Sequence, residues 1–269
     1  MKIIILGSNG FIGSSLKKYF LYKPDFYEVL FPTRNELNLL DYFSCKDYFK
    51  KNKPDIIVNC AVEEKNIEHT LRIFFNTLST SDFFGKMVYL GSGAEYNPKN
   101  YLPLMKEDYS KKDWPTLGYP FSKWLIGDYI EKQSFQKVIN LRLFGVYGNF
   151  ENFRRRFISN NICRVICGLN LSLNRDMKLD YLHIDDFFKI LEIIISRKST
   201  NHNTYNICTG KPYFLSEIGK IIQKKMKVED DITILEPGFN LEYSGNPLRA
   251  VNEFGEFFSR DFEETIPEM

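Results

Sequence analysis

The sequence predicts an α/β fold in which helices cover both faces of an open parallel sheet. Short apolar runs rich in β-branched residues recur at 2–6, 27–31, 55–60, 86–91 and 137–143. Strands that are buried on both faces require such near-continuous hydrophobicity. Longer segments with helical spacing separate these runs, at 11–22, 42–52, 65–80 and 118–134. A strand–helix alternation of this kind is typical of right-handed βαβ units.

The second part of the chain is less regular and predicts a smaller lobe. We expect helices near 153–168, 184–197 and 214–227, and short strands near 171–173, 203–208 and 232–236. Gly238, Gly245 and Pro247 interrupt a loop-rich stretch towards the C-terminus. The predicted organisation is therefore a first domain of residues 1–150, to which a segment of about 175–210 returns. Residues 151–269 would form mainly a second lobe over the carboxyl end of the sheet, where open α/β sheets bind ligands.

Composition excludes several classes of protein. The 269 residues are 43% apolar, which is too much for a disordered chain. Lysine and arginine total 36 against 34 acidic residues, so the basic excess of a nucleic-acid or anionic-membrane binder is missing. No apolar run reaches the roughly 20 residues that span a bilayer, and the apolar start is too short for a signal peptide. The five cysteines form no CxxC pair and indicate reduced, buried thiols, so we expect a cytoplasmic protein.

A glycine motif follows the first predicted strand directly. Gly7, Gly10 and Gly13 form GxxGxxG, which leads into the helix at 11–22. The first glycine permits a tight turn, the second lets the backbone approach a pyrophosphate, and the third lets helix and strand pack closely. The helix N-terminus then favours the phosphate charge. The motif predicts a Rossmann-type dinucleotide site, with the cofactor-binding residues Gly7, Asn9, Gly10, Phe11, Ile12 and Gly13.

The end of the second strand bears on the choice of dinucleotide. An acidic residue there usually binds the ribose hydroxyls of NAD, but the strand YEVLF continues into Pro32, Thr33 and Arg34. An arginine can instead pair with the 2′-phosphate of NADP. We therefore favour NADP(H) over NAD(H), and NAD(H) with Arg34 as a solvated loop residue stays the alternative.

Three further residues carry a resemblance to a known family. Tyr119 and Lys123 form YxxxK on a predicted helix, and Ser92 ends the strand before it. Together with GxxGxxG, this resembles the extended short-chain dehydrogenase/reductase (NAD-dependent epimerase/dehydratase) family that modifies nucleotide sugars. The similarity continues through NCA at 59–61, LRLFGVYG at 141–148 and DYLHIDD at 180–186. The stretches 33–41 and 90–96 are most similar to the GDP-fucose synthase group of this family and to 4-keto-6-deoxysugar reductases. The resemblance adds Asp41, Cys60, Ala61, Tyr119 and Lys123 to the expected cofactor contacts.

The chemistry of these three residues also follows from their types. Tyrosine and lysine four positions apart lie on one face of a helix. A nearby ammonium stabilises a phenolate, so the pKa of Tyr119 would fall from about 10 towards neutral. Tyr119 could then exchange a proton with a substrate oxygen, and Ser92 would give that oxygen a second hydrogen bond. Ser92, Tyr119 and Lys123 are the predicted catalytic residues.

Residues that are missing narrow the reaction. Dehydratases of this family carry an Asp and a Glu directly after the serine or threonine, where this chain has Gly93 and Ala94. Glu95 comes one place later and would point elsewhere from an extended strand end. The GDP-fucose synthase group adds a cysteine, at the position of Ala94, and a histidine, for which the segment 149–161 offers none. Dehydration and double epimerisation are both disfavoured.

Two reactions need only Ser92, Tyr119 and Lys123. One is NADPH-dependent reduction of the 4-keto group of a nucleotide-linked 6-deoxy sugar, with Tyr119 as proton donor. The other is NAD-dependent 4-epimerisation of a nucleotide sugar. Arg34 favours the reductase. A non-catalytic regulator that only binds a dinucleotide is a third option, which the retained tyrosine and lysine disfavour.

Contacts to a nucleotide-sugar substrate are less well marked in the sequence. Gly145 stands where the family carries an asparagine that contacts the diphosphate. We expect Ser92, Arg154, Arg156 and Arg249 to bind substrate, with Arg155 as a further candidate, although solvated arginines are equally compatible. His183 is expected to pack and to hydrogen-bond. His69 and His202 have no partners at metal-ligand spacing, so no metal is predicted. The resemblance also allows a homodimer through the helix that carries Tyr119.

Overall fold

A computed structural model describes residues 1–133, 137–229 and 231–269. These residues cluster into two compact units. The first contains 1–98, 107–142 and 192–205, and the second contains 99–106, 143–191 and 206–269. For comparison, the sequence predicted a boundary at residue 150 and a returning segment of about 175–210. The returning segment in the structure is the shorter 192–205.

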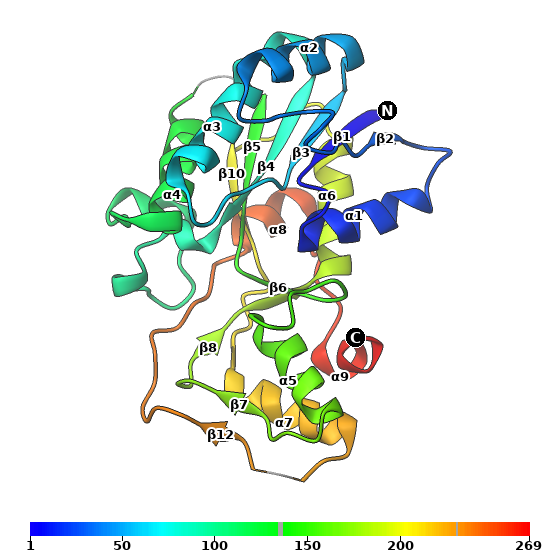
Figure 1. Cartoon of the computed structure of the whole chain (residues 1–269). Coiled ribbons are helices and arrows are strands. Elements are labelled where there is room, and N and C mark those ends of the chain that lie inside the picture. Colours follow the sequence, from blue (N-terminus) through cyan, green and yellow to red (C-terminus); the bar gives the residue numbers. More distant parts are fainter. Residues whose placement is uncertain (134–136, 230) are drawn as a thin grey trace. The chain divides into compact units, whose positions relative to one another are not determined.

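The first unit is built on a parallel sheet, as predicted. In the described part of the chain it has six strands in the order β10-β5-β4-β3-β1-β2, namely β10 (Thr204–Ile207), β5 (Val138–Leu143), β4 (Lys86–Ser92), β3 (Ile56–Asn59), β1 (Lys2–Leu6) and β2 (Glu28–Leu30). β1 pairs in parallel with β2 and with β3, and β3 pairs in parallel with β4. The chain leaves β1 towards one edge and returns to the other side of it at β3 (Figure 1). Ligands bind at such a reversal of strand order, outside the carboxyl ends of the strands.

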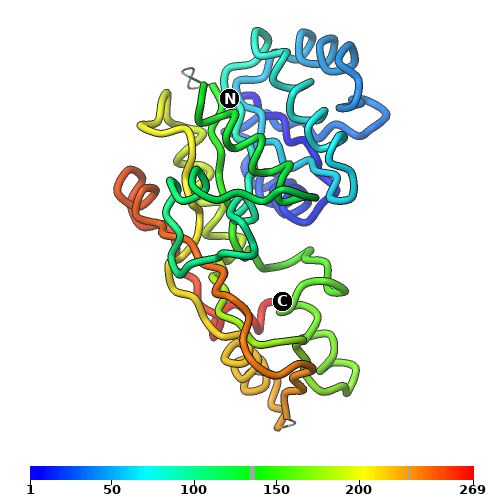
Figure 2. The backbone as a smooth tube through the Cα atoms, turned by 90° about the vertical axis from the view of Figure 1, so that its left-hand side faces the viewer, coloured from blue at the N-terminus to red at the C-terminus, as the bar shows by residue number. Residues whose placement is uncertain are grey.

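Three helices cover one face of this sheet: α2 (Tyr42–Asn52), α3 (Ile67–Leu78) and α4 (Gly118–Lys132). Alternate strand residues such as Ile4, Ile57 and Met87 bury their side chains against Phe49 and Phe74 of the helices. In the backbone view of Figure 2, the blue and cyan coils of α2 and α3 lie next to each other. This apolar layer fixes the sheet edge from which the loops of the site emerge.

The opposite face carries α1 (Phe11–Leu21) and the C-terminal part of α6 (Ile184–Ser196). Tyr19 and Lys23 both donate hydrogen bonds to the carboxylate of Glu192, at 2.6–2.8 Å. The buried Lys86 donates its ammonium protons to the carbonyls of Ile194 and Arg197, the end of α6. A cation at this position satisfies carbonyls that a helix leaves without partners.

The second unit combines short strand pairs with two longer helices. Its helices are α5 (Phe157–Ile166), α7 (Leu215–Met226), α8 (Leu248–Phe254) and α9 (Phe262–Thr265), and its paired strands are β6 (Gly145–Tyr147) with β9 (Tyr181–His183), β8 (Lys178–Leu179) with β11 (Tyr213–Phe214), and β7 (Ser172–Leu173) with β12 (Thr233–Ile234). α5 and α7 pack around Ile158, Ile218 and Ile222. The sequence did not predict β6, β8, β9, β11, α8 or α9, because two to seven residues are too few to establish a period.

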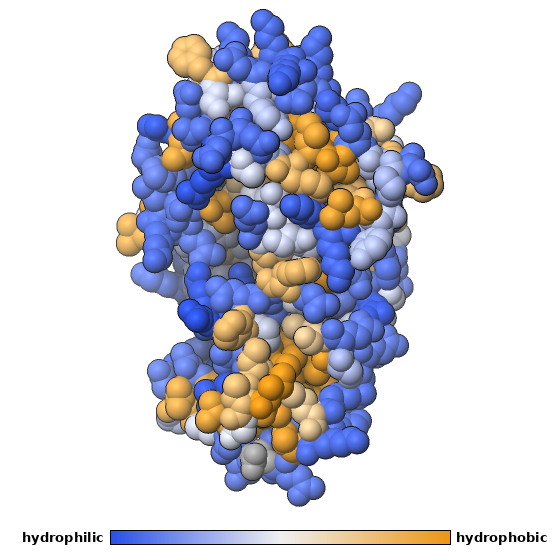
Figure 3. Space-filling model, turned by 45° about the vertical axis from the view of Figure 1, so that its right-hand side comes forward, coloured by the Kyte–Doolittle hydropathy of each residue, from blue (hydrophilic) through white to orange (hydrophobic). Residues whose placement is uncertain are grey.

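The surface is mixed, as expected from the composition. On the face shown in Figure 3, polar side chains predominate, and apolar side chains gather in contiguous areas among them. Within the described ranges, no helix combines the length and the apolar character that crossing a membrane requires. All five cysteines are free thiols. The expectation that they are buried holds for Cys45 and Cys208 but is wrong for Cys167, which is exposed beyond the end of α5.

Gly13 supplies a test of the close packing between the turn after β1 and α1. A Cβ atom at this position would lie 2.2 Å from the carbonyl oxygen of Gly7 and 2.7 Å from Cα of Ser8. Because these obstacles are backbone atoms, G13A should lower the free energy of unfolding by about 1–3 kcal/mol in denaturant titrations. G10A is the matched control, since its Cβ would meet only one atom, at 3.5 Å. Equal stability of G13A and wild type would contradict this packing.

Candidate active site

The glycine motif forms a turn that brings β1, α1 and β3 into close contact. Gly7 has a φ of +75°, a conformation that L side chains rarely adopt, and its carbonyl accepts a hydrogen bond from the amide of Gly10 at 3.1 Å. A Cβ on Gly7 would lie 2.7 Å from the amide nitrogen of Ala61. Gly10 caps α1 without a side-chain hydrogen bond. The first amides of α1 are therefore left for an anionic ligand rather than for a cap.

A cavity of about 550 Å³ opens at this turn, at the switch point between β1 and β3. It is lined by residues that follow the carboxyl ends of β1, β2 and β3 and by the first turns of α3: Leu6, Gly7, Ser8, Asn9, Gly10, Pro32, Thr33, Arg34, Leu37, Asn38, Leu39, Leu40, Cys60, Ala61, Val62, Glu63, His69 and Ile73. A glycine cradle, an uncapped helix N-terminus and an elongated set of lining loops suit a dinucleotide. The residues present therefore fit the cofactor expected from the sequence.

The predicted cofactor residues divide into two groups. Gly7, Asn9, Gly10, Arg34, Cys60 and Ala61 line the cavity. Phe11, Ile12, Gly13, Asp41, Tyr119 and Lys123 do not line it. The first three lie in α1, Tyr119 and Lys123 lie in α4, and the carboxylate of Asp41 caps α2 by accepting from the amides of Phe43 and Ser44. An aspartate directly before a helix is a common cap, which is the signal that could have indicated this role.

An acid that no sequence pattern indicated, Glu36, lies between cavity-lining residues in the sequence. The carboxylate of Glu36 accepts hydrogen bonds from the amide and the hydroxyl of Thr33, at 2.8 and 2.9 Å. These bonds lower the pKa of Glu36. Arg34 lies between the two, is exposed, and lines the cavity. The hydrogen bonds between Glu36 and Thr33 thus stabilise the turn that contains Arg34.

Ser92, Tyr119 and Lys123 lie at the junction of β4 and α4. Ser92 is the last residue of β4, while Tyr119 and Lys123 occupy the first turns of α4. The ammonium of Lys123 donates to the carbonyl of Leu90 at 2.6 Å. It also lies 4.4 Å from the centre of the Tyr89 ring and 5.7 Å from that of Tyr119. The ammonium of Lys123 therefore connects the start of α4 to the end of β4.

Burial lowers the pKa of Lys123. Its side chain is only 3% exposed, and desolvation lowers its pKa to about 8, against the opposing effect of Glu95, Cys60 and Glu64. Cys60 lines the dinucleotide cavity, so its interaction with Lys123 places the ammonium beside that cavity. At neutral pH the lysine remains mostly charged and can stabilise negative charge on the oxygen of Tyr119.

The turn after Ser92 differs from the extended strand end assumed for it. Residues Gly93–Glu95 form a single 3-10 turn, in which the hydroxyl of Ser92 accepts from the amide of Ala94 at 3.1 Å. The carboxylate of Glu95 returns to accept from the amide of Ser92 at 3.2 Å. It is fully buried against Arg142 and Asn140, and burial raises its pKa. Glu95 is thus turned into the protein interior.

The predicted substrate arginines belong to the second unit. Arg154 and Arg155 lie in an exposed turn, and Arg156 immediately precedes α5. Arg249 is half-buried in the first turn of α8. Glu151, which the sequence analysis did not single out, is buried near Arg156, and burial raises the pKa of its carboxyl to about 7.

The histidines show no metal-binding arrangement. Burial lowers the pKa of His183, whose ring packs against Tyr147 at 5.1 Å and whose Nδ1 accepts from the amide of Asp185. His69 lines the dinucleotide cavity instead. Over the described ranges, no group of three His, Cys, Asp or Glu side chains could hold a metal ion.

Several known proteins are similar to this chain in sequence or in fold. The curated GDP-6-deoxy-D-talose 4-dehydrogenase of Aggregatibacter actinomycetemcomitans is 25% identical, over 95% of this chain and 92% of that protein. The crystal structure of dTDP-glucose 4,6-dehydratase from Bacillus anthracis with NAD has a TM-score of 0.84 at 19% identity, covering 100% of this chain and 94% of that one. A GDP-mannoheptose C4 reductase from Campylobacter jejuni with NADP bound has a TM-score of 0.82 at 18% identity, with 98% and 95% covered.

A sequence model of one family matches residues 3–208, which is most of the chain. The matched region contains the glycine turn, the dinucleotide cavity, Ser92, Tyr119 and Lys123. The chain belongs to the NAD dependent epimerase/dehydratase family, whose members modify nucleotide sugars with a nicotinamide dinucleotide.

Proposed function

We propose that this protein reduces the 4-keto group of a nucleotide-linked 6-deoxy sugar with NADPH. The observation that carries the proposal is the buried ammonium of Lys123, which donates to the carbonyl of Leu90 on β4 and lies 5.7 Å from the centre of the Tyr119 ring. It is also near enough to Cys60 of the dinucleotide cavity for the ionised thiol to affect its pKa. This arrangement joins a proton donor to a cofactor site without requiring any further acid or base.

The three residues have separate tasks in this reaction. NADPH supplies a hydride when bound, and C4 of the sugar receives it. Tyr119 donates its hydroxyl proton to the carbonyl oxygen, which becomes the 4-hydroxyl, and the proton of Tyr119 is restored from water. The charge of Lys123 stabilises the phenolate that remains after this transfer. Ser92 donates a hydrogen bond to the same substrate oxygen.

Elimination of water is disfavoured by what surrounds Ser92. Gly93 and Ala94 carry no titratable group, and the carboxylate of Glu95 is occupied by Arg142, Asn140 and the amide of Ser92. No carboxyl group of this turn is left to remove or deliver a proton on the sugar. A keto sugar that another enzyme has already produced is therefore the substrate expected for this site.

Substrate binding requires cations, because a nucleotide sugar carries a diphosphate. We assign this role to Arg154, Arg156 and Arg249, with Arg155 as a further candidate. The curated relative named for a GDP-6-deoxysugar and the solved reductase named for a GDP-heptose support a nucleotide sugar as the class of substrate. They also support chemistry at C4.

An activity assay distinguishes the alternatives. The purified chain should oxidise NADPH, followed by the decay of its fluorescence, when given a GDP-, dTDP-, CDP- or UDP-linked 4-keto-6-deoxy sugar. Interconversion of sugars that carry no keto group, without net oxidation, would instead identify a 4-epimerase. Binding of NADPH with neither reaction would identify a dinucleotide-binding regulator.

Tyr119 should be essential for turnover but not for cofactor binding. Tyr119→Phe keeps the ring over Lys123 and removes the transferred proton, so kcat should fall by about 10²–10⁴-fold. The dissociation constant of NADPH, measured by fluorescence titration, should change little. Near-normal turnover of this variant would remove Tyr119 from the proton-donor role.

Arg34 should decide between the two dinucleotides. If its guanidinium pairs with the 2′-phosphate, Arg34→Ala should weaken NADPH binding by about 10–100-fold, as expected for a charged hydrogen bond, and leave NADH binding unchanged. Lys50→Ala removes the same charge from an exposed position on α2 and serves as the control. Equal losses for NADPH and NADH would show that Arg34 does not read the 2′-phosphate.

A further inference from the structure

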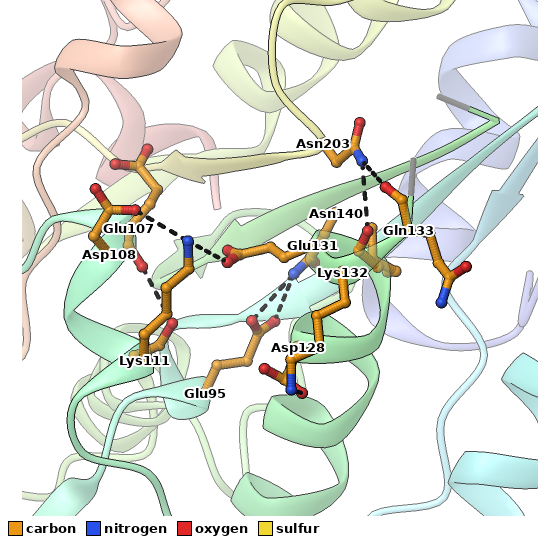
Figure 4. Close-up of polar contacts among 12 residues, drawn as sticks. Glu95, Glu107, Asp108, Lys111, Asp128, Glu131, Lys132, Gln133, Asn140 and Asn203 are labelled. Carbon is orange, nitrogen blue, oxygen red and sulfur yellow. Dashed lines mark hydrogen bonds and ion pairs between the residues drawn. The ribbon is translucent and has the colours of Figure 1, made fainter. Parts of the chain in front are cut away.

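A buried polar network lies directly behind Ser92. The carboxylate of Glu95 accepts from Nε of Arg142 and, through both of its oxygens, from the amide of Asn140 at 3.1 Å. Arg142 continues the network to the carboxylate of Glu131 on α4, at 3.0 Å. Figure 4 shows Glu95 directed at Asn140, while Glu131 also reaches Lys111. The side chains of Glu95 and Arg142 are 0% and 1% exposed, so water solvates neither charge to any large extent.

The carboxylate of Glu95 packs between β4 and α4, the two elements that carry the proposed catalytic residues. Its Oε1 lies 2.3 Å from where a Cβ of Gly91 would be, on β4 immediately before Ser92. Its Oε2 lies 2.2 Å from the corresponding point on Gly127, one turn of α4 beyond Lys123. Only glycine leaves room for the carboxylate at both points. Glu95 thus sets how closely the end of β4 approaches α4.

The hydrogen bonds around Glu95 indicate its charge. Every group that bonds to it is an N–H donor: the amide of Ser92, the side-chain amide of Asn140 and the guanidinium of Arg142. A carboxylate can accept all of these bonds at once, and the guanidinium of Arg142 that bonds to it is permanently charged. The ionised form therefore fits this pocket.

Glu95 is also the buried negative charge that acts on Lys123. The groups that face Lys123 come from four segments: Cys60 and Glu64 after β3, Tyr89 on β4, Glu95 in the turn, and Tyr119 on α4 itself. Burial raises the pKa of Cys60 to about 12 and that of Tyr89 well above 10, so both are neutral near pH 7. Glu64 is exposed, and water screens it.

We propose that Glu95 is a positioning residue: held by Arg142 and Asn140, it fixes Ser92 against α4 and supplies the negative charge that keeps Lys123 protonated. The proposal rests on the proposed function only in assigning Ser92, Tyr119 and Lys123 to the reaction. It predicts that removing the charge of Glu95 changes the pKa of Lys123, although no hydrogen bond of the network joins the two residues.

The test is Glu95→Gln, which keeps the shape of the side chain and removes its charge. With lysines labelled at ¹³Cε, the titration of Lys123 is followed by NMR in the protein without substrate, and its signal is identified by its loss in Lys123→Arg. The Lys123 pKa should fall by about one pH unit or more, because an opposite charge has been removed from a buried site. The alkaline limb of the kcat profile should move towards acid by the same amount, with the dissociation constant of NADPH unchanged.

Asp128→Asn is the matched control. It removes a carboxylate from α4, the helix that carries Lys123, where Asp128 pairs with Lys132; Figure 4 draws no contact between Asp128 and Glu95. This variant should leave the Lys123 titration and the pH profile as in wild type. A Lys123 pKa that is the same in E95Q as in wild type would overturn the proposal and leave Glu95 a purely structural residue.

Two further measurements keep the outcome decisive. If E95Q does not fold, the double variant E95Q/R142M removes the buried pair as a whole, so that Arg142 is not left without its carboxylate, and it still lacks the charge of Glu95. Its Lys123 pKa should still be lowered, by less than in E95Q because a positive charge is lost as well, and an unchanged or raised value would overturn the proposal. If the wild type reduces no keto sugar, the proposed function fails, but the NMR titration still decides the role of Glu95.

Discussion

The buried ion pair of Glu95 and Arg142 is the interaction on which the arrangement of the first unit depends. It joins the turn after β4, strand β5, and α4 through Glu131, and Arg142 also donates to the carbonyl of Glu107. Removing one partner of a buried pair leaves an uncompensated charge, which destabilises proteins by about 3–5 kcal/mol. Since a domain is stable by only about 5–15 kcal/mol, this region tolerates little change. The same residues hold Ser92 and α4 in register, so fold and site share one constraint.

Much of the fold could be predicted because long elements repeat their pattern. The apolar runs located β1 to β5 to within one or two residues, and the glycines located the turn that forms the dinucleotide cavity. Strands β8 and β11 have two residues each and follow tertiary pairing instead of a period. The sequence nevertheless contained the capping-box pattern of Ser92 and Glu95, a serine followed three residues later by a glutamate. Reading it would have indicated that Glu95 turns inward.

Some residues of the site could not be assigned from the sequence, because nearby donor groups of the protein occupy side chains that could otherwise bind a ligand. Asp41 resembles a cofactor contact, yet two backbone amides at the start of α2 already occupy its carboxylate. Glu36 is an acid near the end of β2, yet Thr33 accounts for both of its short bonds. In each case the residue type permits ligand binding, while the nearest donor decides its use. The second unit contains the arginines that we propose for substrate binding, and the exposed Arg154, Arg155 and Arg156 have no such local signature.

Keeping Lys123 charged in the interior opposes stability, and we propose that its role in proton transfer offsets this cost. A fall of its pKa from 10.5 to about 8 corresponds to about 3 kcal/mol of lost preference for the protonated form. Because the folded state has the lower pKa, it binds fewer protons than the unfolded chain between pH 8 and 10.5. This lysine alone would thus make the protein more stable as pH rises through that window, with its full penalty present below pH 8. A neutral apolar residue would avoid the penalty at every pH. In the reaction proposed above, this ammonium stabilises the phenolate that Tyr119 forms when it gives up its proton.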